Sequence, residues 1–380
     1  MKVLYILNAK IMGGATISLF NMLDMLKEDV TPVLVAPKSG LMDDTFKSYV
    51  DNNHIRLYTI PVCVHAIYRP KNFLQFLRWP VSRVLMCLRH FVSMAMLERI
   101  VEKENPDLIH TNVGVIWEGL EVAKKKSIPH VWHVREYQDK DFNWMIIPSK
   151  RSYINHLLSS DAVVTISNGI RRHFRLDGCC KAETVFNGIY SSAECRMEMP
   201  KDDYFLCASR IMPEKGHEDV IRAFAYFRRK NSNYRLKIAG FGDVNFISRL
   251  SCLAKRLDCL DAVEFVGFHK DMRNLMSHAK ALIVASRFEG FGRMTAEAAF
   301  MGCLVIGRNT GGTKEIIDKT GGFLFSSVEE LAEEMERLSS IEDSTYLALA
   351  QKAQSVAKQA YSTENNAAQI LSIYKKLLRR

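Results

Sequence analysis

No stretch of this 380-residue sequence is both long and apolar enough to cross a lipid bilayer. The best candidate, VLMCLRHFVSMAML at residues 84–97, is short and is interrupted by Arg89 and His90. The opening residues, MKVLYILNAK, lack the small-residue cleavage pattern of a secretory signal, so we expect them to form a first strand. The sequence therefore predicts a cytoplasmic protein, with a peripheral position on the inner membrane face as the alternative.

Cysteine motifs for metal binding or redox chemistry are also missing. The nine cysteines are scattered without C-x-x-C spacing, and the adjacent Cys179 and Cys180 could not form an ordinary disulfide with each other. No group of His, Cys and Asp has the spacing of metal ligands along the chain. We therefore expect reduced thiols, no metal and no cofactor.

Charge of one sign is not concentrated anywhere in the chain. The formal net charge is +10, and Lys plus Arg exceed Asp plus Glu by 24 to 18 in residues 1–190 and by 28 to 24 in residues 191–380. An excess that is shared so evenly does not indicate a nucleic-acid-binding tail. It suits anionic small substrates or an anionic membrane surface.

What the sequence has is a regular alternation of short apolar runs and amphipathic stretches. Continuous apolar strands that alternate with helices are typical of parallel sheets covered on both faces. The predicted strands are 3–7, 32–37, 55–61, 107–112, 129–134, 162–167, 183–188, 204–209, 234–240, 263–268, 281–286, 303–307 and 322–326.

A polar stretch, YSSAECRMEMPKDD at residues 190–203, interrupts the alternation and predicts a domain boundary. We expect an α/β protein of two doubly wound, Rossmann-like domains that face each other across a cleft, with residues 1–190 in the first and 191–362 in the second. A final helix at 363–380 follows the last strand of the second domain. In such sheets ligands bind at the carboxyl ends of the strands.

Residues 70–104 are helical in period, basic and rich in large apolar side chains. Arg78, Arg83 and Arg89 lie among Phe, Leu, Trp and Met, which is the composition of an amphipathic helix on an anionic membrane. A crossover helix buried against the sheet is the alternative, and the fold class favours it because doubly wound domains require such helices.

The stretch SRFEGFGRMTAEAAFMG, residues 286–302, follows a predicted strand and contains two carboxylates eight positions apart. Gly290 and Gly292 allow a ligand to approach the main chain. A helix predicted to begin near Arg293 offers unpaired amides to an anion. Glu297 lies one turn into that helix and suits vicinal hydroxyls better than a phosphate. Together with Glu289, this pattern fits a ribose, a diphosphate and a sugar, which make up a nucleotide-sugar.

A second pair of residues supports an anionic ligand. Arg210 follows the strand YFLCAS, and Lys215 comes five positions later, before a glycine and a helix. Arginine offers a fork of donors to phosphate oxygens, and lysine offers a mobile point charge. Either residue alone would be an ordinary loop cation, but both belong to the loops at the carboxyl end of the same predicted sheet.

The motifs SR-x4-KG, EGFG-x4-E and GG-x2-E-II (311–317) occur in an order and spacing that resemble family 4 of the retaining glycosyltransferases, which have the GT-B fold. The resemblance covers nearly the whole chain and is most specific over residues 204–325. It implies that Arg210 and Lys215 bind the donor diphosphate, that Glu297 binds the ribose hydroxyls, and that Glu289 contacts the transferred sugar. The backbone of the turn and of the first helical residues would contact the donor, through Gly290, Phe291, Gly292, Met294 and Thr295.

The same resemblance assigns the acceptor to the first domain and returns helix 363–380 to it. Gly13 and Gly14, after the first strand, resemble the glycine loop of the family. His133 in VWHVREY matches the position of a histidine that positions the donor sugar. The family more often reads His-Asp there, whereas this chain reads His-Val-Arg-Glu, so the roles of Arg135 and Glu136 stay open.

Two further patterns resemble known motifs, but we assign the function of the motif to neither of them. AGFGDV at 239–244 lacks the third glycine of a dinucleotide fingerprint, because Asn245 occupies that position. DKD at 139–141 has the spacing of a metal-diphosphate motif but lies in a polar loop without supporting residues. Neither pattern changes the expectation of a metal-independent enzyme.

The predicted function is transfer of a sugar from a nucleoside-diphosphate-sugar to a saccharide or lipid-linked saccharide acceptor, as in the synthesis of cell-surface polysaccharide. An anionic membrane surface is a further expected partner, through residues 70–104, and nucleic acid is not. Two alternatives stay open at this stage. One is a nucleotide-sugar epimerase of similar two-domain fold, and the other is a non-catalytic subunit that binds nucleotide-sugars.

Overall fold

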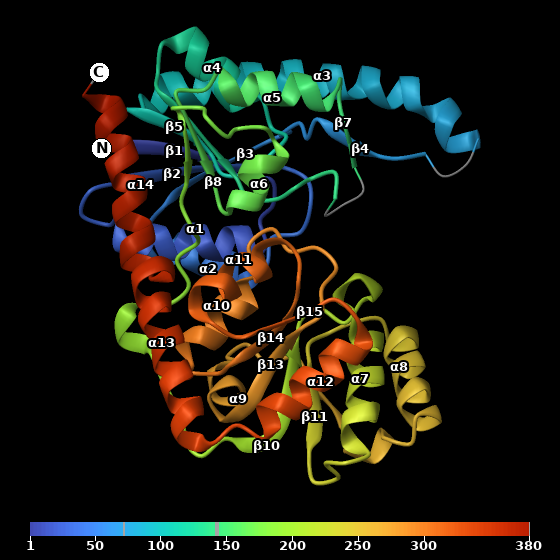
Figure 1. Ribbon diagram of the computed structural model, residues 1–380. Coiled ribbons are helices and arrows are strands. Elements are labelled where there is room, and N and C mark those ends of the chain that lie inside the picture. The colour runs from blue at the N-terminus through green and yellow to red at the C-terminus, as the bar shows by residue number, and fades with distance from the viewer. Residues whose placement is uncertain (71–72, 141–143, 380) are drawn as a thin grey trace. The chain divides into compact units, whose positions relative to one another are not determined.

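The computed structural model describes residues 1–70, 73–140 and 144–379, without the side chains of residues 74–78. The chain divides into two compact units, Met1–Gly188 with Asn366–Arg380, and Ile189–Asn365. Each unit is built around one parallel sheet with helices on its faces (Figure 1). The prediction of two Rossmann-like α/β domains is therefore confirmed.

The first unit contains a seven-stranded parallel sheet in the order β3-β2-β1-β5-β6-β8-β9. Its strands are β1 (Lys2–Ile6), β2 (Thr31–Pro37), β3 (Arg56–Ile60), β5 (Leu108–Thr111), β6 (His130–Val134), β8 (Ala162–Thr165) and β9 (Ala182–Thr184). Its helices are α1 (Gly14–Met25), α2 (Asp44–Asn52), α3 (Phe73–Glu104), α4 (Glu118–Lys126), α5 (Lys150–Leu158), α6 (Asn168–His173) and α14 (Thr363–Leu378).

Both faces of this sheet are buried, as the continuous apolar strands predict. Alternate residues of β1 point to opposite faces: Tyr5 belongs to a core that includes α1 and α14, and Ile6 to a core that includes α3 and α4. Within the first core, the Tyr374 hydroxyl lies 2.5 Å from Nδ1 of His110 and donates to the Tyr5 hydroxyl at 3.2 Å. The end of the chain thus completes the core of the unit that contains its beginning.

An additional pair of short strands, β4 (Ala66–Tyr68) and β7 (Trp144–Ile146), forms an antiparallel ladder outside the main sheet. This pair is not among the predicted strands, because three-residue strands carry too little alternation to stand out. The ladder joins the segment after β3 to the segment after β6.

The second unit contains a six-stranded parallel sheet in the order β12-β11-β10-β13-β14-β15. Its strands are β10 (Asp202–Ala208), β11 (Arg235–Ala239), β12 (Val263–Gly267), β13 (Ala279–Val284), β14 (Val305–Arg308) and β15 (Phe323–Phe325). Its α-helices are α7 (His217–Arg228), α8 (Val244–Arg256), α9 (Arg273–His278), α10 (Arg293–Phe300), α11 (Gly311–Thr320), α12 (Val328–Ser339) and α13 (Asp343–Tyr361), and short 3₁₀ turns cover Ser192–Glu194, Pro213–Lys215 and Leu260–Ala262.

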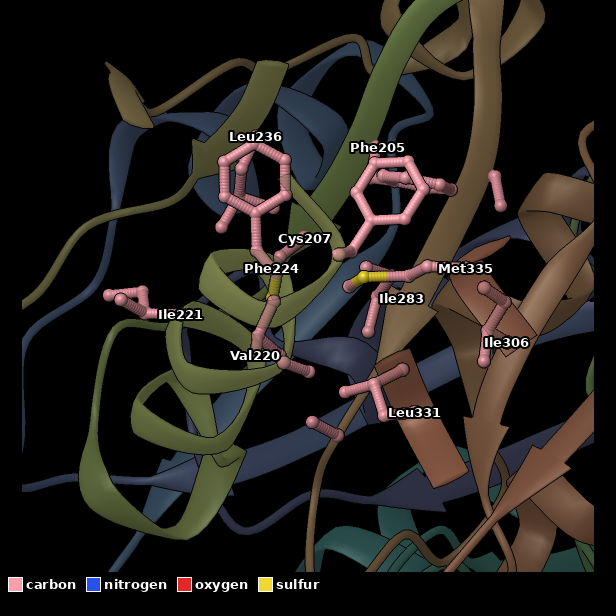
Figure 2. Packing of buried hydrophobic residues seen from close by; sticks show 14 of the residues in the cluster. Phe205, Cys207, Val220, Ile221, Phe224, Leu236, Ile283, Ile306, Leu331 and Met335 are labelled. Atoms are coloured by element: carbon pink, nitrogen blue, oxygen red, sulfur yellow. The ribbon is translucent and has the colours of Figure 1, made fainter. Parts of the chain in front are cut away.

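The core of the second unit lies between its sheet and the helices α7 and α12 (Figure 2). Phe205 of β10 and Phe224 of α7 are fully buried in it, together with Met335 of α12. The apolar residues of α7 recur at spacings of three and four, so that one stripe of the helix faces the sheet. This packing fixes the loops that follow β10 and β13, where the predicted motifs lie.

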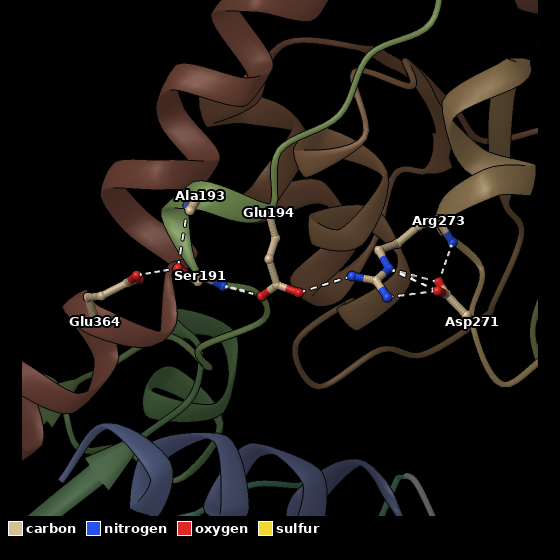
Figure 3. A network of polar contacts seen from close by, with 6 residues as sticks. All are labelled: Ser191, Ala193, Glu194, Asp271, Arg273 and Glu364. Carbon is tan, nitrogen blue, oxygen red and sulfur yellow. Dashed lines mark hydrogen bonds and ion pairs between the residues drawn. The ribbon is translucent and has the colours of Figure 1, made fainter.

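The polar stretch after residue 189 is fixed by ion pairs and hydrogen bonds (Figure 3). The Ser191 hydroxyl donates to Glu364 at 2.6 Å, and the Ser191 amide donates to Glu194 at 2.9 Å. Glu194 in turn pairs with Arg273 at 3.0 Å, and Arg273 pairs with Asp271 at 2.7 Å. The segment that breaks the sequence pattern is therefore an ordered part of the second unit.

Candidate functional site

Helix α10 begins at Arg293, where the sequence predicts it. Gly292 precedes it with φ of +91°, a left-handed conformation that side chains rarely adopt, and it supplies no capping side chain. The first amides of the helix, including those of Met294 and Thr295, have no partner within the helix and carry the positive end of its dipole. The end of α10 can therefore bind an anion.

The EGFG turn before α10 rests on the two glycines that begin α11. The amide of Gly312 donates to the carbonyl of Glu289 at 2.8 Å. A Cβ atom on Gly312 would lie 2.0 Å from the carbonyl oxygen of Phe291, and one on Gly311 would lie 2.5 Å from that of Glu289. Only glycine allows this approach, which explains the glycine pair of the third motif.

Lys215 and Glu289 meet at the carboxyl end of the sheet. The ammonium of Lys215 donates to Oε1 of Glu289 at 2.6 Å, and the two side chains are 20% and 21% exposed. Their loops are joined by the backbone as well, because the Arg287 amide donates to the Glu214 carbonyl at 3.0 Å. An ammonium has three protons, so two remain for a ligand.

Arg210 lies two residues after β10, in the same loop as Lys215, and its side chain is exposed. Within the described part of the chain, its guanidinium has no ion-pair partner. The predicted cations therefore differ: one already binds a carboxylate, and the other is available to a ligand.

Glu297 is buried one turn inside α10, and its Oε1 accepts from Nε of Arg293 at 2.7 Å. This role of Arg293 is not among the predictions from the sequence, although the i, i+4 spacing of the two residues is the signal that indicates it. The Thr295 hydroxyl is also buried and lacks a hydrogen-bond partner among the described residues. The first turn of α10 thus adds a cation and a free hydroxyl to the predicted amides.

Phe291 differs from its neighbours in the turn. Its side chain is buried, with its ring 5.8 Å from that of Tyr361. A role of Phe291 at the site is therefore limited to its backbone, since its side chain contributes to the core.

The AGFGDV segment after β11 has a packing role. A Cβ on Gly240 would lie 1.9 Å from the Ser209 carbonyl oxygen, and one on Gly242 would lie 2.3 Å from that of Ile211. These glycines let the loops after β10 and β11 approach each other. Phe241 between them and Phe268 after β12 are both exposed, and their rings lie 5.9 Å apart. They offer apolar rings at the same edge of the sheet as Lys215.

In the first unit, Gly13 precedes α1 and Gly14 is its first residue. No atom lies within 4 Å of a Cβ built on either glycine. Unlike Gly312, these glycines are not required by packing within the described chain. They leave open backbone at the start of a helix, as the predicted glycine loop requires.

His133 is the last residue but one of strand β6, close to the carboxyl end of the strand, and its side chain is buried. Its Nδ1 lies 3.4 Å from the Arg135 guanidinium, and its Nε2 has no partner among the described residues. Burial, and then the charge of Arg135, lower the pKa of His133 well below its usual value. The imidazole is therefore neutral near pH 7, with one nitrogen free.

Arg135, whose role the sequence leaves open, is buried beside His133. Its guanidinium donates to Oδ1 of Asn112 at 2.9 Å and to Oδ1 of Asn187 at 2.7 Å. Burial lowers its pKa to about 9, so it stays charged at neutral pH. This arginine connects β5, β6 and the segment after β9 at the carboxyl end of the sheet.

The DKD pattern at 139–141 is described only in part, because Asp141 lies outside the described residues. Asp139 accepts from Lys150 at 3.0 Å and lies 2.7 Å from Nε2 of His173. Burial opposes ionisation, but these two partners lower the pKa of Asp139 to about 2. Asp139 is thus engaged in contacts within the first unit.

A cavity of about 570 Å³ lies in the first unit beside the segments that follow β1, β2 and β3. Its lining also includes one side of α3, with Leu85, Met86 and Arg89. The cavity combines an apolar wall with a cation at the carboxyl end of the parallel sheet, where ligands of this fold class bind.

Two family models match this chain. Residues 197–361 match the model described as glycosyl transferases group 1, and residues 12–192 match the model described as glycosyltransferase family 4. Together they cover most of both units. The chain belongs to the glycosyltransferases of the GT-B type.

Curated relatives are distant. An uncharacterized glycosyltransferase, YqgM of Bacillus subtilis, is 29% identical over 187 residues, which are 46% of this chain and 50% of that protein. A GDP-mannose-dependent monoacylated α-(1-6)-phosphatidylinositol monomannoside mannosyltransferase of Corynebacterium glutamicum is 24% identical and covers 68% of this chain and 73% of its own length. The chain thus spans half of the first relative and about three quarters of the second.

Among solved structures, HepE of Anabaena in complex with UDP has a TM-score of 0.78 at 20% identity. The alignment covers 99% of this chain and 100% of that one. The same protein was solved with UDP-glucose, with a TM-score of 0.74. At this level of identity the similarity establishes the fold, which is GT-B over the full chain.

Proposed function

We propose that this protein is a retaining glycosyltransferase that uses a nucleoside-diphosphate-sugar as donor and needs no metal. The observation that carries the proposal is the 2.6 Å pair of Lys215 and Glu289 beside the open end of α10, with Arg210 in the same group of loops. Cations and helix amides suit a diphosphate, and a carboxylate suits the hydroxyls of a sugar.

Each predicted residue has a defined task in this proposal. Lys215 keeps its bond to Glu289 and donates its remaining protons to the diphosphate, which Arg210 and the amides of Met294 and Thr295 also bind. Glu297 accepts from the ribose hydroxyls, and Glu289 from the transferred sugar. Gly13, Gly14 and His133 act from the first unit: the glycines allow a close approach of substrate to backbone, and the neutral imidazole positions the sugar.

The chemical step breaks the bond between the anomeric carbon of the sugar and the donor phosphate oxygen. The leaving diphosphate gains negative charge, which Lys215, Arg210 and the end of α10 stabilise. The acceptor oxygen then bonds to the anomeric carbon on the same face, and its proton moves to the leaving phosphate oxygen. This series of steps needs no protein base and no metal.

A panel of donors tests the proposal. We expect one of UDP-glucose, GDP-mannose and ADP-glucose to raise the melting temperature by several degrees, because a ligand at 100 times its Kd stabilises the folded state by about 2.7 kcal/mol. The similar proteins named above use or bind different nucleotides, so the nucleotide-sugar that stabilises this protein selectively would identify its donor. Conversion of the donor to another nucleotide-sugar without acceptor would support an epimerase instead. Binding without transfer to any lipid-linked or soluble saccharide would support a non-catalytic subunit.

We further propose that the acceptor is lipid-linked and that α3 contacts an anionic membrane. Leu85, Leu88 and Phe91 are 60%, 58% and 69% exposed along one side of this helix, with Arg83 and Arg89 among them. Among the described residues, the chain has no helix with the length and hydropathy of a membrane span. The cavity beside Arg89 could receive the saccharide of an acceptor whose lipid stays in the bilayer.

Flotation with vesicles tests this contact. We expect the wild-type protein to bind vesicles that contain anionic lipid at low salt and to dissociate as salt is raised. The double substitution Leu85→Glu and Leu88→Glu should lower the bound fraction at least tenfold. Leu347→Glu, which changes an exposed leucine on α13, is the matched control and should bind as the wild type does. Equal binding by the double variant, or no binding by the wild type, would contradict the proposal.

A further inference from the structure

Three side chains of the kind that bind transition metals converge in the first unit, and none of them has a role in the proposed sugar transfer. His65 lies in the segment between β3 and β4, His90 lies in α3, and Glu118 begins α4. A ring nitrogen of each histidine and a carboxylate oxygen of Glu118 all lie within 4.8 Å of one another. Ligands separated by 25 and 28 residues form no spacing motif, so the sequence alone does not indicate this cluster.

Both histidines have a nitrogen without a hydrogen bond. Nδ1 of His65 and Nδ1 of His90 are buried, and neither has a partner among the described residues. His65 as a whole is only 7% exposed. Leaving a buried polar atom unpaired costs free energy. Each of these atoms could instead offer a lone pair to a cation.

The surrounding groups orient the histidines as metal sites require. Nε2 of His90 lies 3.0 Å from Oε2 of Glu121, a carboxylate that can hold the proton of that nitrogen. Carboxylate partners of this kind are usual behind metal-binding imidazoles. The His65 ring stacks on Trp117 with centroids 4.3 Å apart, and Trp117 stacks on His156 at 4.2 Å. These contacts restrict the ring of His65.

The carboxylate of Glu118 is also fixed. Its Oε1 accepts from the Cys63 amide at 2.8 Å, and its Oε2 accepts from the Trp117 amide at 3.1 Å. Backbone amides therefore hold both oxygens of this carboxylate in place.

We propose that His65, His90 and Glu118 form a binding site for a divalent transition ion of the zinc class, with water as the fourth ligand. Two imidazoles and one carboxylate are a known zinc ligand set with one open position. Bond lengths of about 2.0 to 2.2 Å place tetrahedral ligands about 3.4 Å apart, so the three ligand atoms would have to move closer together than the 4.8 Å within which they lie.

The ion would join α3 to the segment before β4 and to the start of α4. Val64 next to His65 and Arg89 next to His90 both line the 570 Å³ cavity. Metal binding would therefore stiffen the wall of this cavity at the exposed part of α3. The proposal concerns this cluster alone and does not depend on which reaction the protein catalyses.

Zinc titration of the full, metal-stripped chain against a chromophoric chelator tests the site. We expect one equivalent of Zn²⁺ to bind, and His65→Ala or His90→Ala to weaken binding at least 100-fold. Glu121→Gln should weaken it about 10- to 100-fold, because it removes the partner of a ligand. His54→Ala changes an exposed histidine of the same unit and should leave the affinity unchanged.

X-ray absorption of the zinc-loaded wild type provides a test that does not rely on any variant folding. It should show two imidazole nitrogens and additional oxygen ligands. Circular dichroism should show that His90→Ala, at a partly exposed helix position, keeps its secondary structure. Absence of stoichiometric binding, unchanged affinity in the His65→Ala, His90→Ala double variant, or a fully aquated ion in the absorption spectrum would overturn the proposal.

Discussion

Replacing Lys215 with alanine should lower kcat by about 10²- to 10³-fold while leaving the fold intact. The proposed role of this ammonium is to stabilise charge on the departing diphosphate, so its loss acts on the transition state. The variant also loses the ion pair with Glu289, but that pair is partly exposed and contributes at most about 1 kcal/mol to folding. Initial rates of glycosyl transfer, measured beside thermal unfolding, separate the two effects.

Arg210→Ala should show the same loss of turnover with an even smaller change in stability, since its guanidinium is exposed and has no ion-pair partner among the described residues. Lys230→Ala is the matched control, because Lys230 forms an exposed pair with Glu336 at 3.0 Å on the surface of the same unit. Wild-type turnover in either Lys215→Ala or Arg210→Ala would refute the assigned roles.

Gly312→Ala should impair both folding and donor binding. The added Cβ would lie 2.0 Å from the carbonyl oxygen of Phe291 and 2.6 Å from its Cα, and backbone atoms cannot rotate away as a side chain can. We expect the free energy of unfolding to fall by about 1 to 3 kcal/mol. The displaced EGFG turn should lower kcat/KM by about 10²-fold, since misplacing catalytic groups by about 1 Å has that effect.

Denaturant unfolding and donor titration measure these two losses. Gly14→Ala is the control for stability alone, because its Cβ would meet no atom within 4 Å and its backbone is not left-handed. Its free energy of unfolding should match that of the wild type or exceed it slightly, as glycine is a poor helix former. A Gly312→Ala variant with normal stability and normal donor affinity would show that α11 does not support the turn.

The strands and the donor loops were predictable because their signals are local. Each of the thirteen strands of the two large sheets corresponds to a short apolar run, and the start of α10 at Arg293 follows from a glycine before a series of helix formers. The β4–β7 pair and the His65 cluster depend on contacts between distant segments, so no short stretch of sequence indicates them.

Burial was the weaker part of the prediction. His133 was assigned from motif position alone, and motif position does not reveal how far a side chain is buried; it is 1% exposed. Helix α3 shows the same limit, because its composition fits both an interfacial helix and a buried crossover. In the structure the two descriptions apply to different parts of the helix: Leu97 and Ile100 are in the core, whereas Leu85 and Leu88 are exposed.

The place of α14 has a consequence for how the protein is made. Residues 1–188 are synthesised before the second unit, but their core also needs Ile370, Ile373 and Tyr374, which are synthesised after it. The second unit, Ile189–Asn365, is continuous and can fold as soon as it emerges. The first unit can therefore be completed only after the second unit has been synthesised, and until then the apolar surface that α14 covers stays exposed.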